Sequence, residues 1–310
     1  MDALMANDSP LTPKPYQHFV WQKYLRSWGT NGAVWCLQDG RLFNTGTRSL
    51  GVKKNFYKLR ELTDFDLQLI PFLLASDKAH PIAQSYHELV LTNVLTPLLL
   101  AKQHSQMLQS PQSVELLDAY NTNAIDNFHT NTEAQFDPLL DRLLVEDMEW
   151  HADAQHAISF YNFIAMQHMR TRNVKEKTMQ RLQTRMGLDI SRIWDILALI
   201  FAFNVGASLF RDRKRRTLVL VRNDTDIPFI TGDQPVVNID GNGEDPPEAL
   251  SMHYPVSPRL ALYLGEPGLK TFPDRGLTAE DAVWLNDQTV RASHAQVYAA
   301  ERAHLEPYMS

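Results

Sequence analysis

The chain has 310 residues, of which 44% are hydrophobic, enough to bury one large core or two smaller ones. Its formal net charge of −6 excludes a global basic field, so a polyanion would have to bind a local patch. The single cysteine, Cys36, excludes an intrachain disulfide and favours a reducing compartment. We therefore expect a cytoplasmic protein.

The first residues contain no basic segment followed by an apolar run, so no signal peptide is expected. Residues 1–15 include three prolines and predict a mobile lead-in. Nothing after them resembles a free linker, and we expect a single domain over residues 16–310.

The N-terminal part predicts a short helix followed by β-structure at about residues 30–60. Aromatic residues at helical spacing predict a helix over residues 16–28 that ends at Gly29. Apolar residues then flank Asp39-Gly40, which favours the positive φ angles of a tight turn. Residues 33–43 therefore predict a β-hairpin.

The sequence pattern from about residue 62 to about residue 211 predicts that the middle of the chain is helical. The periodic apolar residues of 138–169 indicate one long helix, or two with a break near His151. A polar, basic helix over 174–186 should stop at Gly187. Residues with N-terminal capping or first-turn character mark the expected helix starts, namely Thr63, Pro81, Ser110-Pro111, Asp137-Pro138 and, for the last helix of this part, Asp189 or Ser191.

That last helix raises the question of a membrane. Residues 193–210 are almost continuously apolar and are followed by a cluster of basic residues, as in a spanning helix. Asp195, Asn204 and Ser208 interrupt the run, which favours a buried central helix without stable membrane insertion. A membrane-active effector is the alternative.

The C-terminal part predicts strands and one closing helix. Four β-rich runs lie between 217 and 265, at residues 217–221, 228–231, 235–237 and 260–264. Thr278, with Asp281 three residues later, predicts the start of a helix over about 278–300. The element order indicates an α+β fold, with a mostly helical middle and a small mixed or antiparallel sheet built from the N-terminal hairpin and the C-terminal strands.

Several short motifs together resemble one family. The opening His18-Phe19-Val20-Trp21-Gln22-Lys23-Tyr24-Leu25 and the later Gly232-Asp233-Gln234-Pro235-Val236 are the longest of them. On these motifs the chain resembles the bacterial family catalogued as domain of unknown function 4238, over nearly its whole length. The other matching elements are Asn55-Phe56-Tyr57, the set Ala165, Gln167, Arg170 and Thr171, Pro255-Val256-Ser257-Pro258, and Leu285-Asn286.

The resemblance implies a set of positions without a reaction, and two positions depart from the family pattern. Trp21 stands where the family usually has proline, and Gly232 where it usually has serine. A hydroxyl beside Asp233 would therefore have to come from Thr231. The kind of family suggests a role in bacterial defence or in conflict between bacteria.

The motif residues supply the chemistry of a phosphodiester-directed site. His18 could move protons, Arg170 could hold a phosphate, and Asp233 could orient His18 or a metal. These three are the candidate catalytic residues, and His18 and Gln22 should share a helix face, as should Gln167 and Arg170. The candidate substrate-binding residues are Gln22, Gln167, Thr171 and Ser257. We expect a nucleic-acid-cleaving effector.

A structural role for the same residues is the alternative. The carboxylate of an Asp-x-Pro turn commonly accepts backbone N–H groups, and Arg170 could be the buried partner of Asp233. The protein would then be a non-catalytic binding or interaction protein. In that case the motifs would fasten the core instead of forming an active site.

Metal and nucleic-acid binding leave further alternatives open. Glu149, Asp153 and His156 could share a helix face and contribute to a divalent metal site, although a solvated face is the simpler interpretation. The basic stretches at 170–185 and 211–216 could form a positive strip for nucleic acid on this acidic protein, or could be solvated faces.

Overall fold

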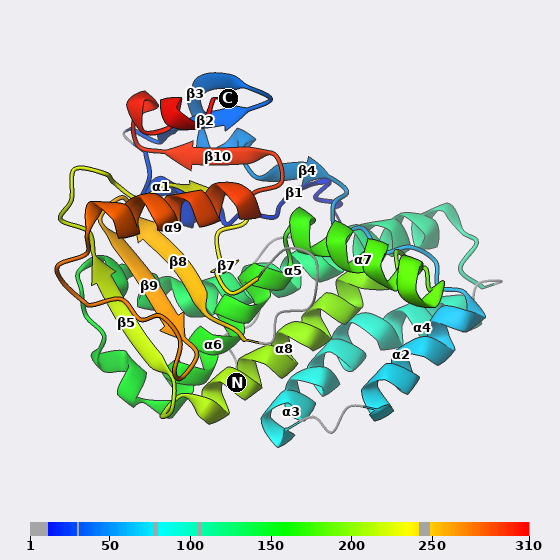
Figure 1. Ribbon diagram of the computed structural model, residues 1–310. Helices are drawn as coiled ribbons and strands as arrows, with labels where there is room; N and C mark the ends of the chain where they lie inside the picture. Colours follow the sequence, from blue (N-terminus) through cyan, green and yellow to red (C-terminus); the bar gives the residue numbers. More distant parts are fainter. Residues whose placement is uncertain (1–11, 30, 77–79, 105–106, 242–248, 310) are drawn as a thin grey trace.

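The computed structural model describes residues 12–29, 31–76, 80–104, 107–241 and 249–309, so most of the expected lead-in lies outside the described part. The α+β class is confirmed, with helices in the middle of the chain and strands towards both ends (Figure 1). One hydrophobic core contains residues from Phe19 to Tyr298. The single-domain organisation itself stays a prediction.

The N-terminal hairpin joins C-terminal strands, as expected. The strands β2 (Ala33–Gln38) and β3 (Arg41–Gly46) turn at Asp39 and Gly40, whose φ angles are 50° and 70°. On its other edge β2 pairs with β10 (Gln296–Ala299), which pairs with β6 (Thr231–Gly232). All pairings in this sheet are antiparallel.

The remaining C-terminal strands form a second sheet instead of extending the first. Its order is β5 (Thr217–Arg222), β9 (Leu260–Gly265), β8 (Met252–Ser257) and β7 (Val237–Asn238), all antiparallel. The strands expected at 228–231 and 235–237 shrink to the two-residue β6 and β7. Helix α9 (Ala279–Ala292) contacts both sheets, through β6 and β7 (Figure 1).

The segment expected as one helix over 16–28 is divided, so this prediction is wrong. Tyr16–His18 form strand β1, which pairs with β4 (Val52–Lys54), and helix α1 covers only Gln22–Arg26. His18 and Gln22 therefore do not share a helix face. Pairing with a strand more than 30 residues away overrides the local helical pattern.

Several helix starts are confirmed by their caps. Thr63 exchanges hydrogen bonds with Asp66, the Ser110 hydroxyl accepts from Ser113 N–H, and the Thr278 hydroxyl accepts from Asp281 N–H. The helices of the middle are α2 (Asp64–Ser76), α3 (Pro81–Val90), α4 (Thr96–Gln103), α5 (Pro111–Leu144), α6 (Ala154–Met169), α7 (Arg172–Met186) and α8 (Trp194–Asp212).

Three expected helix boundaries are wrong. Helix α5 continues through Pro138, where Phe136, Leu139 and neighbouring residues are buried in the core, so packing offsets the lost backbone donor. Helix α8 begins at Trp194 without a side-chain cap, and α9 ends at Ala292. The break near His151 and the stop of α7 at Gly187, whose φ is 65°, are confirmed.

Helix α8 packs closely on α6 in the helical layer. At Gly206 an added Cβ would lie 2.3 Å from Oδ1 of Asn162, so glycine permits this approach. Within the described residues α8 is the one helix long and apolar enough to cross a membrane, and 61% of its most apolar window is buried. The absence of stable membrane insertion stays a prediction.

Candidate functional site

Three of the candidate site residues line one small pocket, which we call the His18 pocket. It has a volume of about 270 Å³ and lies between β1, α1, α5 and the end of α6. His18, Gln22 and Arg170 line it together with Glu133 and His129 of α5. Two of the three candidate catalytic residues thus meet, and Asp233 is not among the lining residues.

The guanidinium of Arg170 is buried, and each of its three nitrogens donates one hydrogen bond. Its Nε donates to the Tyr57 hydroxyl at 2.9 Å, Nη2 donates to the backbone carbonyl of His18, and Nη1 forms an ion pair with Glu133. The side chains of Arg170 and Glu133 are 2% and 14% exposed, so water screens this pair little. The expected pairing of Arg170 with Asp233 is therefore wrong, because Glu133 is the partner.

The ring of His18 is held in one tautomer. Its Nε2 lies 3.2 Å from the carbonyl oxygen of Arg48, and a carbonyl only accepts, so Nε2 carries the proton. In the neutral ring Nδ1 is then the proton acceptor. Burial lowers the pKa of His18 and the cation of Arg170 lowers it further, against an opposing effect of the Arg48 carbonyl. The ring is accordingly neutral at pH 7.

Other titratable groups of this pocket come from α5 and escaped the sequence analysis. Burial raises the pKa of Glu133 and of Asp126, and the cation of Arg170 opposes both shifts. Burial lowers the pKa of His129 well below its usual value. The spacing of 126, 129 and 133 on one helix face was the available signal. Such a group of perturbed residues at a pocket is typical of functional sites.

Asp233 lies elsewhere and holds the turn between α9 and β10. Its carboxylate accepts the backbone N–H groups of His294, Ala295 and Gln296 at 2.7, 2.8 and 3.1 Å. Burial raises its pKa, and the three N–H groups oppose that shift. The expected meeting of Asp233 with His18 is not formed, and the observed geometry is that of a structural turn.

The late motif and the middle helix meet through Gln234. The Thr171 hydroxyl donates to Oε1 of Gln234, whose Nε2 donates to the backbone carbonyls of Val236 at 2.8 Å and His168 at 3.2 Å. Thr171 and Gln234 are both buried. Thr171 thus ties α6 and α7 to the segment after β6, and its hydroxyl is committed to this contact.

The other candidate binding residues are dispersed. Ser257 accepts the backbone N–H groups of Arg259 and Leu260 in the turn between β8 and β9. Gln22 donates to the Thr47 hydroxyl at 3.4 Å while lining the His18 pocket. Gln167 is buried in α6, and its Nε2 lacks a hydrogen-bond partner among the described residues. The expected shared face of Gln167 and Arg170 does not place Gln167 in the pocket.

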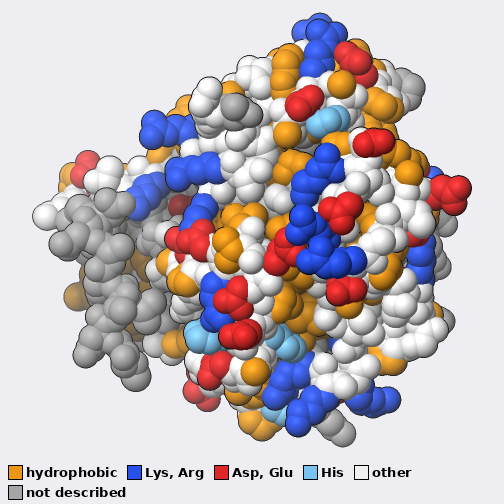
Figure 2. All heavy atoms as spheres, turned by 90° about the vertical axis from the view of Figure 1, so that its left-hand side faces the viewer, with side chains coloured by type: hydrophobic (Ala, Val, Ile, Leu, Met, Phe, Trp, Pro, Cys, Tyr) orange, Lys and Arg blue, Asp and Glu red, His pale blue; other side chains and the backbone are white. Residues whose placement is uncertain are grey.

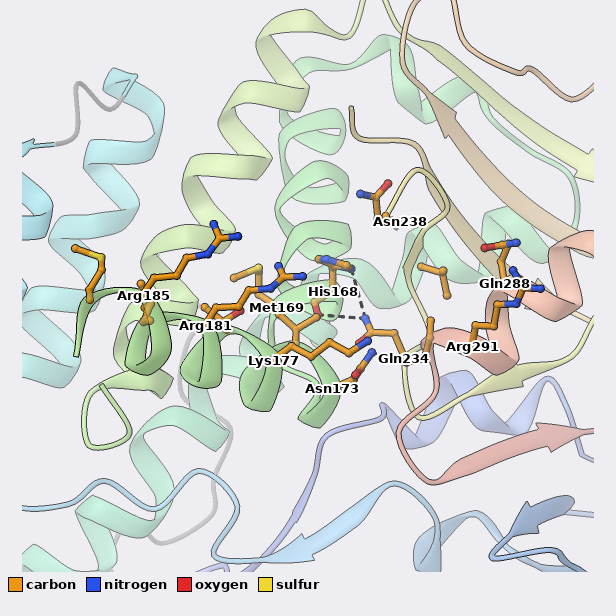
Figure 3. A pocket seen from close by; sticks show the side chains of 17 residues that line it. His168, Met169, Asn173, Lys177, Arg181, Arg185, Gln234, Asn238, Gln288 and Arg291 are labelled. Atoms are coloured by element: carbon orange, nitrogen blue, oxygen red, sulfur yellow. Dashed lines mark hydrogen bonds between the residues drawn. The ribbon is translucent and has the colours of Figure 1, made fainter. Parts of the chain in front are cut away.

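A larger, positively charged pocket, the basic pocket, lies between α7, α9 and the segment after β6 (Figure 3). Its volume is about 740 Å³. Four cations line it, and no lining residue within the described part of the chain is a carboxylate. Lys177, Arg181 and Arg185 come from α7, inside the predicted basic stretch, and Arg291 comes from α9. Sequence analysis missed Arg291, because only the fold brings α9 to α7.

Two of these cations are uncompensated. Lys177 and Arg291 are exposed, and neither forms a hydrogen bond or an ion pair with another residue of the described ranges. By contrast, Lys175 on the same helix pairs with Asp195 at 2.9 Å, and Arg172 pairs with Glu176 at 2.7 Å. The face of α7 towards the basic pocket thus keeps positive charge available for an anion.

The second basic stretch, residues 211–216, does not continue this surface. It follows the C-terminal end of α8, whereas Lys175 of α7 pairs with Asp195 in the first turn of α8. Because α8 has 19 residues, its two ends lie about 28 Å apart. Arg216 in this stretch pairs with Glu266 at 2.8 Å. Over the middle of the face shown in Figure 2, basic and acidic side chains are interspersed.

The possible metal residues do not form a cluster. Glu149 lies in a 3₁₀ turn before α6, and Asp153 caps α6 by accepting from His156 N–H at 2.9 Å. Among the residues that the structure describes, no group of three or more His, Cys, Asp or Glu side chains could hold a metal ion.

Comparison with protein families matches residues 16–303 to the family described as "Protein of unknown function (DUF4238)". The chain belongs to this family, which confirms the resemblance inferred from the motifs. Comparison with curated proteins and with solved structures gives no match.

Proposed function

We propose that this protein binds nucleic acid through the phosphate groups at the basic pocket and cleaves the phosphodiester backbone at the His18 pocket. The observation that supports binding most strongly is the pair Lys177 and Arg291. They come from different helices, face one pocket and have no ionic partner in the described ranges. On a protein of net charge −6, a phosphate backbone needs such a local patch.

The pocket lining favours contact with the backbone over contact with the bases. The described lining residues include no Phe, Tyr or Trp side chain on which a base could stack, and the ring of His168 is held by the carbonyl of Val236. The cations would instead attract phosphates with little regard to sequence. We therefore expect salt-sensitive binding with weak sequence preference.

Cleavage is assigned to the neighbouring His18 pocket. Met169 lines the basic pocket and the next residue, Arg170, lines the His18 pocket, so both pockets adjoin the α6–α7 junction, and the proposal requires a bound strand to reach from one to the other. Nδ1 of the neutral His18 would accept the proton of the attacking hydroxyl or water as its oxygen forms a bond to phosphorus. The P–O bond to the leaving sugar oxygen would then break, and this oxygen would take a proton from solvent water. Arg170, whose donors are engaged, would act by positioning Glu133 and the backbone of His18.

The test uses purified protein with fluorescein-labelled single-stranded RNA and DNA, followed for affinity and for cleavage in the same samples. Replacing both pocket cations (Lys177→Ala with Arg291→Ala) should raise the Kd at least tenfold. The matched control (Lys214→Ala with Arg215→Ala) removes two exposed cations beyond α8 and should leave the Kd unchanged. Equal weakening by both pairs would contradict the proposed site.

A separate variant tests the reaction. His18→Ala should reduce cleavage about 100-fold or more at unchanged affinity, since general base catalysis commonly contributes that much. Intact substrate with the unmodified protein, in the presence or absence of divalent ions, would remove the catalytic part of the proposal.

The second candidate is a nucleic-acid-binding protein without catalysis, in which the motifs are structural. The specific observation in its favour is that the side chains of Arg170 and Asp233 form hydrogen bonds with other residues of the chain. Retained, salt-sensitive binding without any cleavage would support this candidate.

A further inference from the structure

A second pocket of different chemistry, which we call the amide pocket, lies between α3, α5, α6 and α8. Its volume is about 460 Å³. None of the described residues that line it carries a charge. Side-chain amides and aromatic rings predominate instead, which is unlike both the basic pocket and the His18 pocket.

One wall is a ladder of amides along α5. Asn127, Asn131 and Gln135 follow one another at steps of four, so they lie on one helix face. The three side chains are exposed and make no hydrogen bond within the described chain, and each offers donors and an acceptor. Asn123, one step earlier, is committed to the backbone of Lys14 and Thr12. The ladder is therefore available to a ligand.

The opposite wall holds a buried amide whose hydrogen-bonding capacity is largely unused. Asn162 of α6 lines the pocket and is 3% exposed, yet neither its nitrogen nor its oxygen makes a hydrogen bond of ordinary geometry within the described part. Its polar neighbour is the Tyr86 hydroxyl, and their interaction lowers the pKa of Tyr86 against the larger effect of burial. A side-chain amide offers two donors and an acceptor, so Asn162 keeps capacity for a further polar partner.

Aromatic rings complete the lining. Tyr86 of α3 stacks on Phe203 of α8, with ring centroids 4.5 Å apart and planes 10° apart. Phe128 of α5 meets Phe203 edge-on at 5.8 Å. Flat rings beside unpaired amides suit a planar ligand whose edge carries both donors and acceptors.

We propose that the amide pocket binds a nucleobase, presented as a nucleoside or as a base of a bound strand. Asn and Gln recognise base edges by paired donor and acceptor contacts, and aromatic rings stack on base faces. The lack of charged groups in the described lining disfavours a phosphate or an amine at this site. The site does not depend on the basic pocket or on cleavage.

The test is isothermal titration of the full-length protein with adenosine, guanosine, cytidine and uridine, and with glucose as a comparison. At least one nucleoside should bind saturably and glucose should not. Replacing two ladder residues (Asn127→Ala with Asn131→Ala) should raise the nucleoside Kd tenfold or more. Gln112→Ala changes an exposed amide of α5 outside the pocket and should leave the Kd unchanged.

Two further variants keep the outcome clear. Asn162→Leu should abolish nucleoside binding while the protein remains folded, judged by its melting temperature. The Lys177→Ala and Arg291→Ala double variant should bind nucleoside normally, which separates this site from the proposed function. No binding of any nucleoside at millimolar concentration, a preference for glucose, or unchanged binding by the ladder variant would overturn the proposal.

Discussion

Asp233→Ala should destabilise the protein strongly without acting through catalysis. Asp233 is 3% exposed, and its carboxylate accepts three backbone N–H groups, which the substitution would deprive of this acceptor. Each hydrogen bond to a charged group contributes about 1.5–3 kcal/mol to stability. Burial of the charged carboxylate is unfavourable, as its raised pKa shows, and this cost offsets part of the contribution of the three hydrogen bonds. We expect a net loss of about 3–5 kcal/mol in the free energy of unfolding.

Urea unfolding followed by tryptophan fluorescence measures this loss. Asp233→Asn keeps one acceptor and should lose roughly 1–2 kcal/mol. Asp226→Ala removes an exposed aspartate of the same segment and should change the free energy of unfolding by less than about 0.5 kcal/mol. If Asp233→Ala unfolds like the unmodified protein but no longer cleaves nucleic acid, the structural assignment of Asp233 is refuted.

Three other results follow from buried polar groups. Burial lowers the pKa of His253 to about 3, below its ordinary 6.5, so the stability that it contributes is present above pH 6.5 and is lost as the pH falls. Between pH 7 and 5 the unmodified protein should lose about 2 kcal/mol of its free energy of unfolding through this histidine. In His253→Phe that part of the pH dependence should be absent. The same pH dependence of urea unfolding in the variant and the unmodified protein would contradict this prediction. Glu133→Gln leaves the buried Arg170 without its counter-ion and should lower the free energy of unfolding by about 3–5 kcal/mol. The control Glu176→Gln removes the acid of an exposed ion pair and should lower it by less than about 0.5 kcal/mol. Similar losses in the two variants would contradict a stabilising role of the Arg170–Glu133 pair. Asn162→Leu should keep or raise the melting temperature, since it removes a buried amide that makes no hydrogen bond of ordinary geometry within the described residues. A sharp fall would indicate that its interaction with Tyr86 stabilises the fold.

Local signals in the sequence predicted much of the fold. Caps such as Thr63 and Thr278 and the Asp39-Gly40 turn act within a few residues, so their effect is visible without the fold. Strands β1 and β10 were missed, because each depends on a partner strand far away in the chain.

The candidate site was predicted only in part, for a similar reason. His18 and Arg170 do meet, but through a backbone carbonyl that no residue pattern announces. The partner of Asp233 is the backbone of residues 294–296, and the side-chain types of these residues do not indicate such a contact either. Glu133 was overlooked because it is one of several acids in a long helix, where acidic residues usually belong to a solvated face.

The central claim is that phosphate groups bind between α7 and α9, and the salt dependence of affinity tests it most directly. Each phosphate contact to a single strand contributes about −0.7 to the slope of log K against log salt concentration. Removing Lys177 and Arg291 should therefore make the slope less steep by about 1.4, while removing Lys214 and Arg215 should leave it unchanged. The same slope in all three proteins, or no measurable affinity for RNA or DNA at low salt, would contradict the account.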